Sequence, residues 1–173
     1  MKKKFKLTSE FIIIYGRKLF RIEALISFSD ITAGDLGGYI EKEGNLSHYG
    51  NAWVYDDAKV YGNAKVCGNA WVYDDAEVCG DAKVCGDAKV CGDAKVCSDA
   101  DYSTIKGFGT CFRNTTFFRC KDGSVKVACG CFLGTLAQFR KQVKRTRTGK
   151  TVKEYLMIAD LMEYHFSKEG EKP

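Results

Sequence analysis

The sequence predicts a mainly β protein whose centre is a parallel β-helix, with three short strands in each coil of eighteen residues. Two observations predict this fold. Residues 48–101 divide into nine consecutive units of six residues, in which valine recurs from Val54 to Val96 and alanine from Ala52 to Ala100. The eighteen residues GNAWVYDDAKVYGNAKVC (50–67) also recur as residues 68–85 with three changes. A period of eighteen made of three sixes is typical of a coil with three flat sides.

Each unit of six has a direct structural interpretation. Its valine points inward and the two neighbours point outward, because side chains alternate along a strand. The Gly-Asn, Gly-Asp or Asp-Asp pair that follows is expected at a corner, where residues that tolerate left-handed conformations are favoured. Alanine is small enough to lie inside beside the valine, and successive coils pair at about 4.8 Å. We therefore expect the β-helix to cover residues 48–101.

This pattern resembles the left-handed parallel β-helix of the bacterial transferase hexapeptide superfamily, over about a third of the chain. The resemblance implies a left-handed coil and a homotrimer with sites in clefts between subunits. The segment AGDLGGYIE (33–41), together with the repeats, also resembles hexapeptide-repeat proteins encoded by phages and prophages. That second resemblance implies a phage or prophage origin and the cytoplasm of a bacterial host, but no reaction.

Residues 1–47 are expected to form an N-terminal β cap before the first coil. Runs rich in β-branched and aromatic residues, separated by a Gly-Arg turn, indicate a β-hairpin or a small sheet. The expected strands are Phe5–Leu7, Glu10–Tyr15 and Lys18–Leu25. Gly34, Gly37 and Gly38 then indicate a tight loop.

Residues 102–173 are expected to form a C-terminal appendage of a β-hairpin and two helices. Thr115–Cys120 and Val125–Phe132 are strand-like and are joined by the turn sequence KDGS. Thr135 with Gln138, and Thr151 with Glu154, have the spacing of helix capping boxes. The apolar face of the second helix consists of Val152, Tyr155, Leu156, Ala159, Met162 and Phe166. We expect both appendages to cover the ends of the β-helix, whose terminal strands would otherwise be open edges.

Charge is spread unevenly beneath a net charge of +5. Residues 1–47 carry +2, residues 48–101 carry −5 and residues 102–173 carry +8. Five of the nine cysteines occupy one repeat position, where other units have tyrosine. The N-terminal sequence MKKKFK lacks the pattern of a signal peptide, so we expect reduced thiols that pack as small hydrophobic residues in a cytosol. The chain contains no apolar run of membrane-spanning length, and no membrane partner is expected.

Outward aromatic residues are the first candidates for ligand binding. Trp53 and Tyr55 flank inward Val54, and Trp71 and Tyr73 occupy the same places one coil later. A stack of four outward rings suggests either a ring-binding surface or an interface. The alternative is that the N-terminal sheet, the C-terminal helices or another subunit covers them.

A basic run near the C-terminus is the second candidate. It contains Arg140, Lys144, Arg145 and Arg147, and arginine suits the binding of phosphates. The alternative is the solvated face of a helix and its following loop. The acidic β-helix and the lack of a recognised motif argue against nucleic acid as a partner.

Neither a metal site nor a catalytic centre is expected. The pairs Asp56-Asp57 and Asp74-Asp75 are more typical of turns than of a metal site. Four cysteines (Cys111, Cys120, Cys129 and Cys131) lack the paired spacing of zinc ligands. Hexapeptide acyltransferases use a histidine as general base, and the chain has only His48 and His165. His48 is expected at the inward valine position, where packing is its simplest role.

The first functional hypothesis is therefore a non-catalytic binding protein that needs no cofactor. It could act as a phage-borne sponge that sequesters a nucleotide signal of the host, with the four aromatic residues on the base and the four basic residues on the phosphates. One alternative is an acetyl-coenzyme A-dependent acyltransferase with His48 as its base. Another is a purely structural or oligomerisation module.

Overall fold

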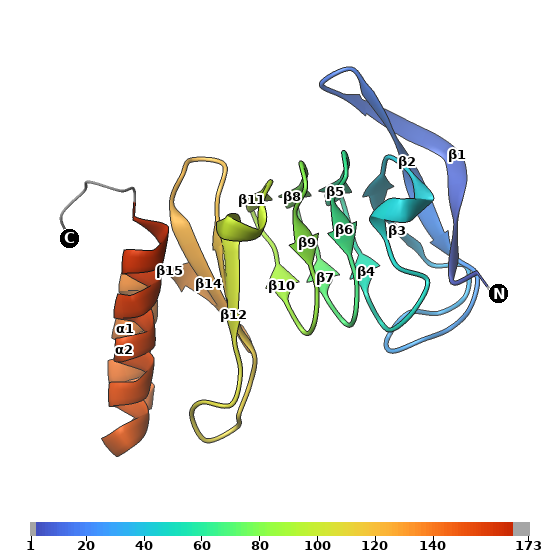
Figure 1. Cartoon of the computed structure of the whole chain (residues 1–173). Coiled ribbons are helices and arrows are strands. Elements are labelled where there is room, and N and C mark those ends of the chain that lie inside the picture. The colour runs from blue at the N-terminus through green and yellow to red at the C-terminus, as the bar shows by residue number, and fades with distance from the viewer. Residues whose placement is uncertain (1–2, 168–173) are drawn as a thin grey trace. The chain divides into compact units, whose positions relative to one another are not determined.

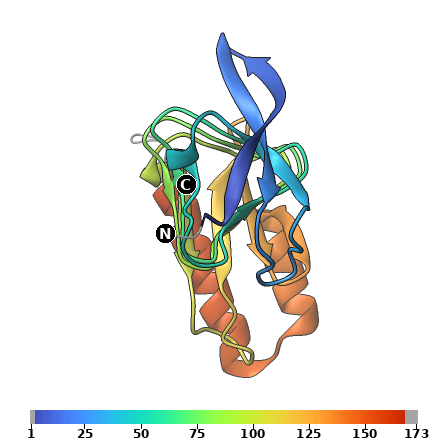
Figure 2. The ribbon, with the colours of Figure 1, turned by 90° about the vertical axis from the view of Figure 1, so that its right-hand side faces the viewer.

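A β-solenoid of about three turns, with about eighteen residues in each turn, is the central element of the fold (Figure 1). The computed structural model describes residues 3–167. These residues belong to two units, one that ends at Asp99 and one that begins at Ala100. The solenoid belongs to the first unit. Viewed along their axis, its coils superpose (Figure 2).

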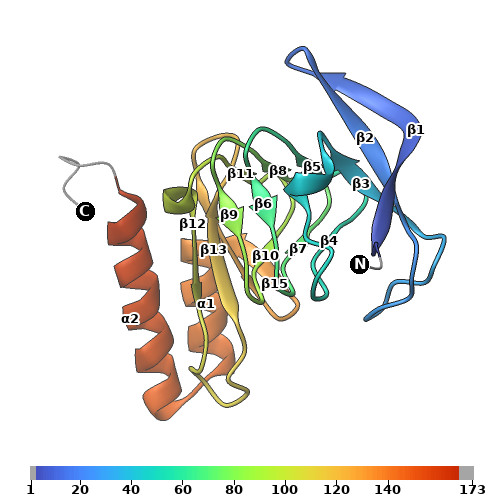
Figure 3. The same cartoon turned by 45° about the vertical axis from the view of Figure 1, so that its right-hand side comes forward.

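The solenoid has three faces made of short parallel strands. The first face contains β3 (Leu36–Ile40), β5 (Lys59–Val60), β8 (Glu77–Val78) and β11 (Lys95–Val96). The second contains β4 (Trp53–Val54), β7 (Trp71–Val72) and β10 (Lys89–Val90), and the third contains β6 (Lys65–Val66) and β9 (Lys83–Val84). Figure 3 shows β6 and β9 on the face turned toward the viewer.

The register of the coils confirms the period of eighteen. Val54 pairs with Val72, and Val72 pairs with Val90. All eight repeat valines and the alanines from Ala52 to Ala94 are fully buried. The backbone bonds run from coil to coil, as in the bond from Tyr55 N–H to the Val72 carbonyl at 2.8 Å. The hydrophobic interior is therefore a column of stacked valines and alanines, as the sequence predicts.

The corner residues act as turn formers. Asp56 and Asp74 both have left-handed backbones, with φ of 51° and 59°. The Asp74 carboxylate accepts a hydrogen bond of 3.0 Å from the N–H of Gly92 in the next coil. These aspartates therefore hold neighbouring corners together.

The first coil begins earlier than the repeat pattern indicates. Ile40 pairs with Val60, and Leu46 forms a bridge with Val66. The expectation that His48 occupies the inward position one coil before Val66 is therefore wrong. Leu46 lies six residues after Ile40 but eight before Val54, so two additional residues, Ser47 and His48, precede the regular repeat.

An antiparallel pair of strands extends the first face of the solenoid. β1 (Phe5–Ile14) pairs with β2 (Arg17–Ala24), which pairs with β3. Its tip projects beyond the coils (Figure 3). Gly38 is needed where β3 joins the coil, because a Cβ atom there would lie 2.6 Å from the Ala58 carbonyl oxygen.

Two buried polar side chains close the N-terminal end of the solenoid. Lys4 Nζ donates to the carbonyls of Ala52 at 2.7 Å and Gly50 at 3.3 Å. Asn45, in the short 3-10 helix Glu43–Asn45, donates to the Ala64 carbonyl at 2.8 Å. These carbonyls would otherwise face an absent coil, so the two side chains replace the hydrogen bonds of that coil.

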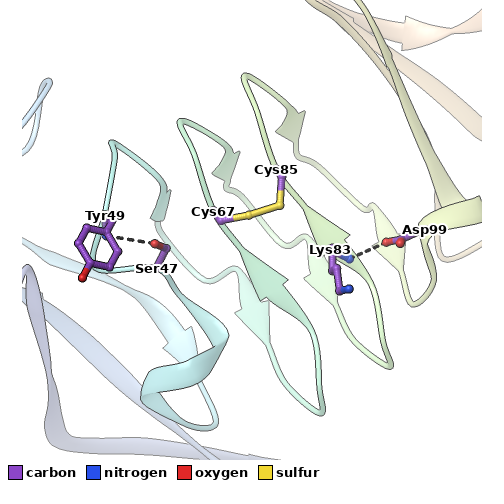
Figure 4. Close-up of a disulfide and its surroundings, with 6 residues drawn as sticks. All are labelled: Ser47, Tyr49, Cys67, Lys83, Cys85 and Asp99. Carbon is purple, nitrogen blue, oxygen red and sulfur yellow. Dashed lines mark hydrogen bonds between the residues drawn. A yellow bond between two sulfur atoms is a disulfide. The ribbon is translucent and has the colours of Figure 1, made fainter.

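Disulfides join coils on two faces. Cys67 bonds to Cys85 across eighteen residues (Figure 4). Cys79 bonds to Cys97 with the same separation. The expectation that the column consists of reduced, unpaired thiols is therefore wrong for these four cysteines. The reason is the stacking itself, which sets the two Cα atoms 4.7 Å apart in the first pair, within the range that a disulfide spans. Cys91, on the remaining face, is buried and unbridged.

The second unit contains an antiparallel sheet and two helices. The 3-10 turn Asp99–Asp101 leads into the sheet, which contains β12 (Tyr102–Ile105), β13 (Thr115–Arg119), β14 (Val125–Cys129) and β15 (Phe132–Thr135) in that order. The helices α1 (Leu136–Thr146) and α2 (Gly149–Phe166) bury a core against it. The central residues of that core are Phe117, Val127, Phe139, Val143, Ile158 and Met162. None of the described helices is both long and apolar enough to cross a membrane.

One helix start is confirmed and the other is wrong. The Thr135 hydroxyl accepts from Gln138 N–H at 3.2 Å, and Gln138 Oε1 accepts from Thr135 N–H at 2.8 Å, so this capping box exists. By contrast, α2 begins at Gly149, with Thr148 as its cap and no side-chain bond to the helix. Thr151 therefore lies inside the helix, where its apolar neighbours already pack on the core.

Candidate functional site

Three of the four predicted outward aromatic residues line a cavity on the second face of the solenoid. We call this cavity of about 300 Å³ the solenoid pocket; it is lined by Asp30, Tyr55, Asp56, Trp71, Tyr73 and Lys89. The Tyr55 and Trp71 rings meet edge to face, with their centroids 5.5 Å apart. The Tyr55 hydroxyl donates to Asp30 Oδ1 at 3.2 Å.

Trp53 does not reach this pocket. Its side chain is fully buried, and the rings of Phe5 and Phe28 pack edge-on against it at 6.4 and 5.5 Å. Both phenylalanines come from the N-terminal segment of the same unit. For this residue, the structure therefore shows coverage by the protein's own N-terminal region.

The tyrosines of the solenoid pocket remain protonated over the ordinary pH range. Burial raises the pKa of Tyr55 well above its usual value, and the negative charge of Asp30 adds to this effect. Burial likewise raises the pKa of Tyr73. The pocket therefore presents neutral rings and carboxylates, together with the ammonium group of Lys89.

The basic run divides into residues with different surroundings. Arg140 donates to Asp160 and Glu163, both at 2.7 Å, so its charge is already neutralised between α1 and α2. Arg145 donates to the Gln142 side chain at 2.8 Å, and Lys144 is exposed. Arg147 lines a cavity. The predicted set is therefore not one site.

The cavity next to Arg147 is here called the C-terminal pocket, and its volume is about 300 Å³. Its lining residues are Arg113, Cys129, Cys131, Phe132, Phe139, Gln142, Val143, Thr146, Arg147 and Tyr155. Phe139 packs against Phe132 at 5.7 Å and against Tyr155 at 5.8 Å. Among the residues that the structure describes, Arg113 and Arg147 have no carboxylate within ion-pair distance.

The loop that carries Arg113 is held in place by Tyr155. The Tyr155 hydroxyl donates to the Phe108 carbonyl at 3.2 Å. A Cβ atom on Gly109 would lie 2.5 Å from that hydroxyl, and one on Gly130 would lie 2.6 Å from Arg113 Nη1. Both glycines therefore provide room for side chains of the pocket. Sequence reasoning missed Arg113 because it belongs to no basic cluster.

His48 packs between the N-terminal segment and the first coil. Its Nδ1 accepts a hydrogen bond of 3.2 Å from Lys4 N–H, and its ring stacks on Phe5 at 4.3 Å. A neutral imidazole whose Nδ1 accepts must carry its proton on Nε2, which lies 3.9 Å from Glu43 Oε2. Neither ring nitrogen then has a free lone pair for a substrate proton. His165 is exposed near the end of α2.

The scattered cysteines of the second unit do not converge. Within residues 3–167, no three of Cys111, Cys120, Cys129 and Cys131 bring their sulfur atoms together as ligands for one ion. Cys129 instead accepts a hydrogen bond of 3.2 Å from the Thr115 hydroxyl.

No protein-family model matches this chain, and no curated protein sequence matches it.

Proposed function

We propose that the protein is a non-catalytic binding protein for a small phosphate-bearing molecule with an aromatic ring, and that the C-terminal pocket is its binding site. One observation carries this proposal. Two arginines without a carboxylate partner among the described residues line the same cavity as three aromatic side chains, and all five belong to one unit.

The charge of the pocket favours an anion. Residues 100–173 carry fourteen basic and seven acidic side chains, a net charge of +7. The charge of Arg140 is neutralised by its ion pair with Asp160. Arg113 and Arg147 line the cavity without a carboxylate partner among the described residues, so their charges are available to a ligand. The forked donors of a guanidinium match the oxygens of a phosphate, and two such groups neutralise a dianion.

The apolar wall favours a ring next to that phosphate. Phe132 is half-buried and packs against the buried ring of Phe139 at 5.7 Å, so its position is fixed by the core and little entropy is lost when a base stacks on it. A cavity of about 300 Å³ is at the small end of ligand sites, which favours a mononucleotide over a larger molecule.

The absence of a positioned base supports binding without catalysis. The lining residues include two thiols, Cys129 and Cys131, but no histidine or carboxylate. The lining therefore offers no general base to a bound substrate. The alternative acyltransferase function would use His48, but its Nδ1 already accepts a hydrogen bond from Lys4 N–H and its ring packs on Phe5. The proposed function therefore involves no acetyl-coenzyme A.

The finer features suggested by the repeat belong to the same proposal. We propose a left-handed coil of the hexapeptide superfamily type and a homotrimer, in which each subunit carries its own C-terminal pocket. The proposed biological role is sequestration of a host nucleotide by a phage-encoded protein in the bacterial cytoplasm. The basic C-terminal unit and the eighteen-residue repeat support these proposals.

Calorimetric titration with adenosine monophosphate, adenosine and inorganic phosphate tests the site. We expect adenosine monophosphate to bind and Arg113→Ala or Arg147→Ala to weaken binding at least tenfold, about 1.4 kcal/mol each. Lys144→Ala is the matched control, because it removes an exposed charge from the last turn of α1, close to Arg147 in the chain, but does not line the pocket; it should change affinity less than twofold.

Thiol labelling gives an independent readout. Cys131 is exposed and lines the pocket, whereas Cys111 is exposed but does not line it. A bound nucleotide should slow alkylation of Cys131 and leave Cys111 unchanged. Nucleotide binding that survives both arginine substitutions, with no protection of Cys131, would exclude the C-terminal pocket as the site. Native mass spectrometry of the same samples tests the trimer.

A further inference from the structure

The solenoid pocket combines three features that point to a ligand different from the phosphate-bearing one. It has three rings, from Tyr55, Trp71 and Tyr73, and two carboxylates, from Asp30 and Asp56. It also contains a positive group of the protein itself, since Lys89 Nζ lies 4.6 Å from the centroid of the Trp71 ring. We propose that this pocket binds a small organic cation with a quaternary ammonium group, such as choline.

The position of Lys89 shows that the Trp71 ring accepts a cation. Trp53, Trp71 and Lys89 are in register on successive coils, so the third coil has lysine where the first two have tryptophan. The ammonium lies within the range of about 6 Å over which the negative face of an indole attracts a cation. A ligand cation would contact the same ring while Lys89 turns toward solvent.

The neighbouring carboxylates select for positive charge. Asp30 is held at the rim by the hydroxyl of Tyr55, at 3.2 Å, and so remains beside the rings. Residues 48–101 carry a net charge of −5, so the surroundings of the pocket also favour a cation. Because the pKa values of Tyr55 and Tyr73 are raised, both hydroxyl groups stay protonated and both rings stay uncharged.

A quaternary ammonium fits better than a metal ion or a primary amine. It has no N–H groups to satisfy, so it loses little when rings replace its water. Metal ions require several oxygen ligands, whereas most of the wall is aromatic. The Asp56 carboxylate is already engaged, because its Oδ2 accepts from Asp74 N–H at 3.4 Å.

The test is titration of the whole protein with choline and with its uncharged analogue, in which carbon replaces the quaternary nitrogen. Trp71 provides the signal, since the chain has two tryptophans and Trp53 is fully buried. We expect choline to quench emission and the uncharged analogue to bind at least tenfold more weakly. Equal affinity for the two compounds would overturn the proposal.

Substitution of Lys89 changes ligand affinity in opposite directions for a cation and for an anion. Lys89→Met removes the competing ammonium, so choline affinity should rise by about tenfold. If the pocket instead binds an anion or a neutral ring through Lys89, the same change lowers affinity. Lys65→Met is the matched control, because Lys65 has the same place in its repeat unit but is exposed on the third face.

Two further variants separate loss of the site from loss of the fold. Trp71→Leu should abolish choline binding. This variant lacks the tryptophan whose emission reports binding, so its affinity is measured by calorimetry. Tyr55→Phe keeps the ring but removes the bond that holds Asp30 at the rim, so it should weaken choline binding far less than Trp71→Leu does. Binding that persists in Trp71→Leu contradicts the proposal. Sedimentation with phosphatidylcholine vesicles then shows whether the headgroup is recognised in a membrane or only as a free molecule.

Discussion

Lys4 provides a quantitative test of how the solenoid end is closed. Its side chain is 1% exposed, and burial lowers the pKa of its ammonium from 10.5 to about 8. The folded protein therefore binds fewer protons than the unfolded chain between these two values. Below pH 8 both states are protonated and the cost of the buried charge is fully present. As the pH rises from 8 toward 10.5, that cost disappears and the free energy of unfolding increases.

The size of the effect follows from the same pKa values. Each pH unit within this window contributes about 1.4 kcal/mol, so the whole window corresponds to about 3 kcal/mol. Solvent at the end of the solenoid screens part of this, and we expect about 2 kcal/mol. Lys4→Met should have no such increase. It should also be less stable at high pH, because the carbonyls of Gly50 and Ala52 lose their donor.

The assay is urea unfolding at pH 7.5, 8.5 and 9.5, followed by tryptophan emission. Both tryptophans are in the solenoid unit, so the signal reports that unit alone. Lys6→Met is the control, since Lys6 is half-exposed and forms a surface ion pair of 2.9 Å with Glu23. If the wild type and Lys4→Met show parallel pH curves, the argument from burial is wrong.

Four further predictions concern single contacts. Gly80→Ala should lower the free energy of unfolding by about 3 kcal/mol or more, because the added Cβ atom would clash with the Cys97 carbonyl. Gly86→Ala is the control: Gly86 has a similar φ but open space around it, so the free energy of unfolding should fall by only about 1 kcal/mol. Asn45→Ala should cost about 2 kcal/mol in the same urea assay, since it leaves the carbonyls of the next coil without donors. Reduction of the disulfides should lower stability by about 3 kcal/mol for each bridge, and a non-reducing peptide digest should show both cross-links. Arg140→Met should change stability by less than about 1 kcal/mol, because its carboxylate partners are largely exposed; a larger loss would mean that α1 and α2 depend on this pair.

The repeat made the solenoid predictable because each position of the six-residue unit has the same structural role in every coil. Valine every six residues fixed the inward direction, and the spacing of eighteen fixed the number of faces. The start of the solenoid was not predictable in the same way. Leu46 and Ile40 stack in the coil but lie outside the valine and alanine pattern, so the pattern placed the start of the solenoid at His48.

The site was predictable only where it follows the repeat. Tyr55, Trp71 and Tyr73 come together because coils place equivalent residues in columns. Arg113 could not be inferred, since a loop held by Tyr155 brings it to the cavity, and no local pattern encodes that contact. The cysteine column contained the spacing for disulfides, but absence of a signal peptide pattern favoured thiols.

The two overlapping disulfides also determine how the chain responds to a pulling force. From Cys67 to Cys97 the chain advances thirty positions, but the shortest covalent path crosses both bridges and advances only the six positions that separate Cys79 from Cys85. Force applied at the ends therefore cannot extend the other twenty-four positions while both bridges are intact, and reduction of one bridge frees only six of them. At about 3.5 Å per residue, reduction of both bridges would release roughly 80 Å of chain, and reduction of one bridge roughly 20 Å. The middle of the solenoid thus behaves as an inextensible link whose length is set by its oxidation state.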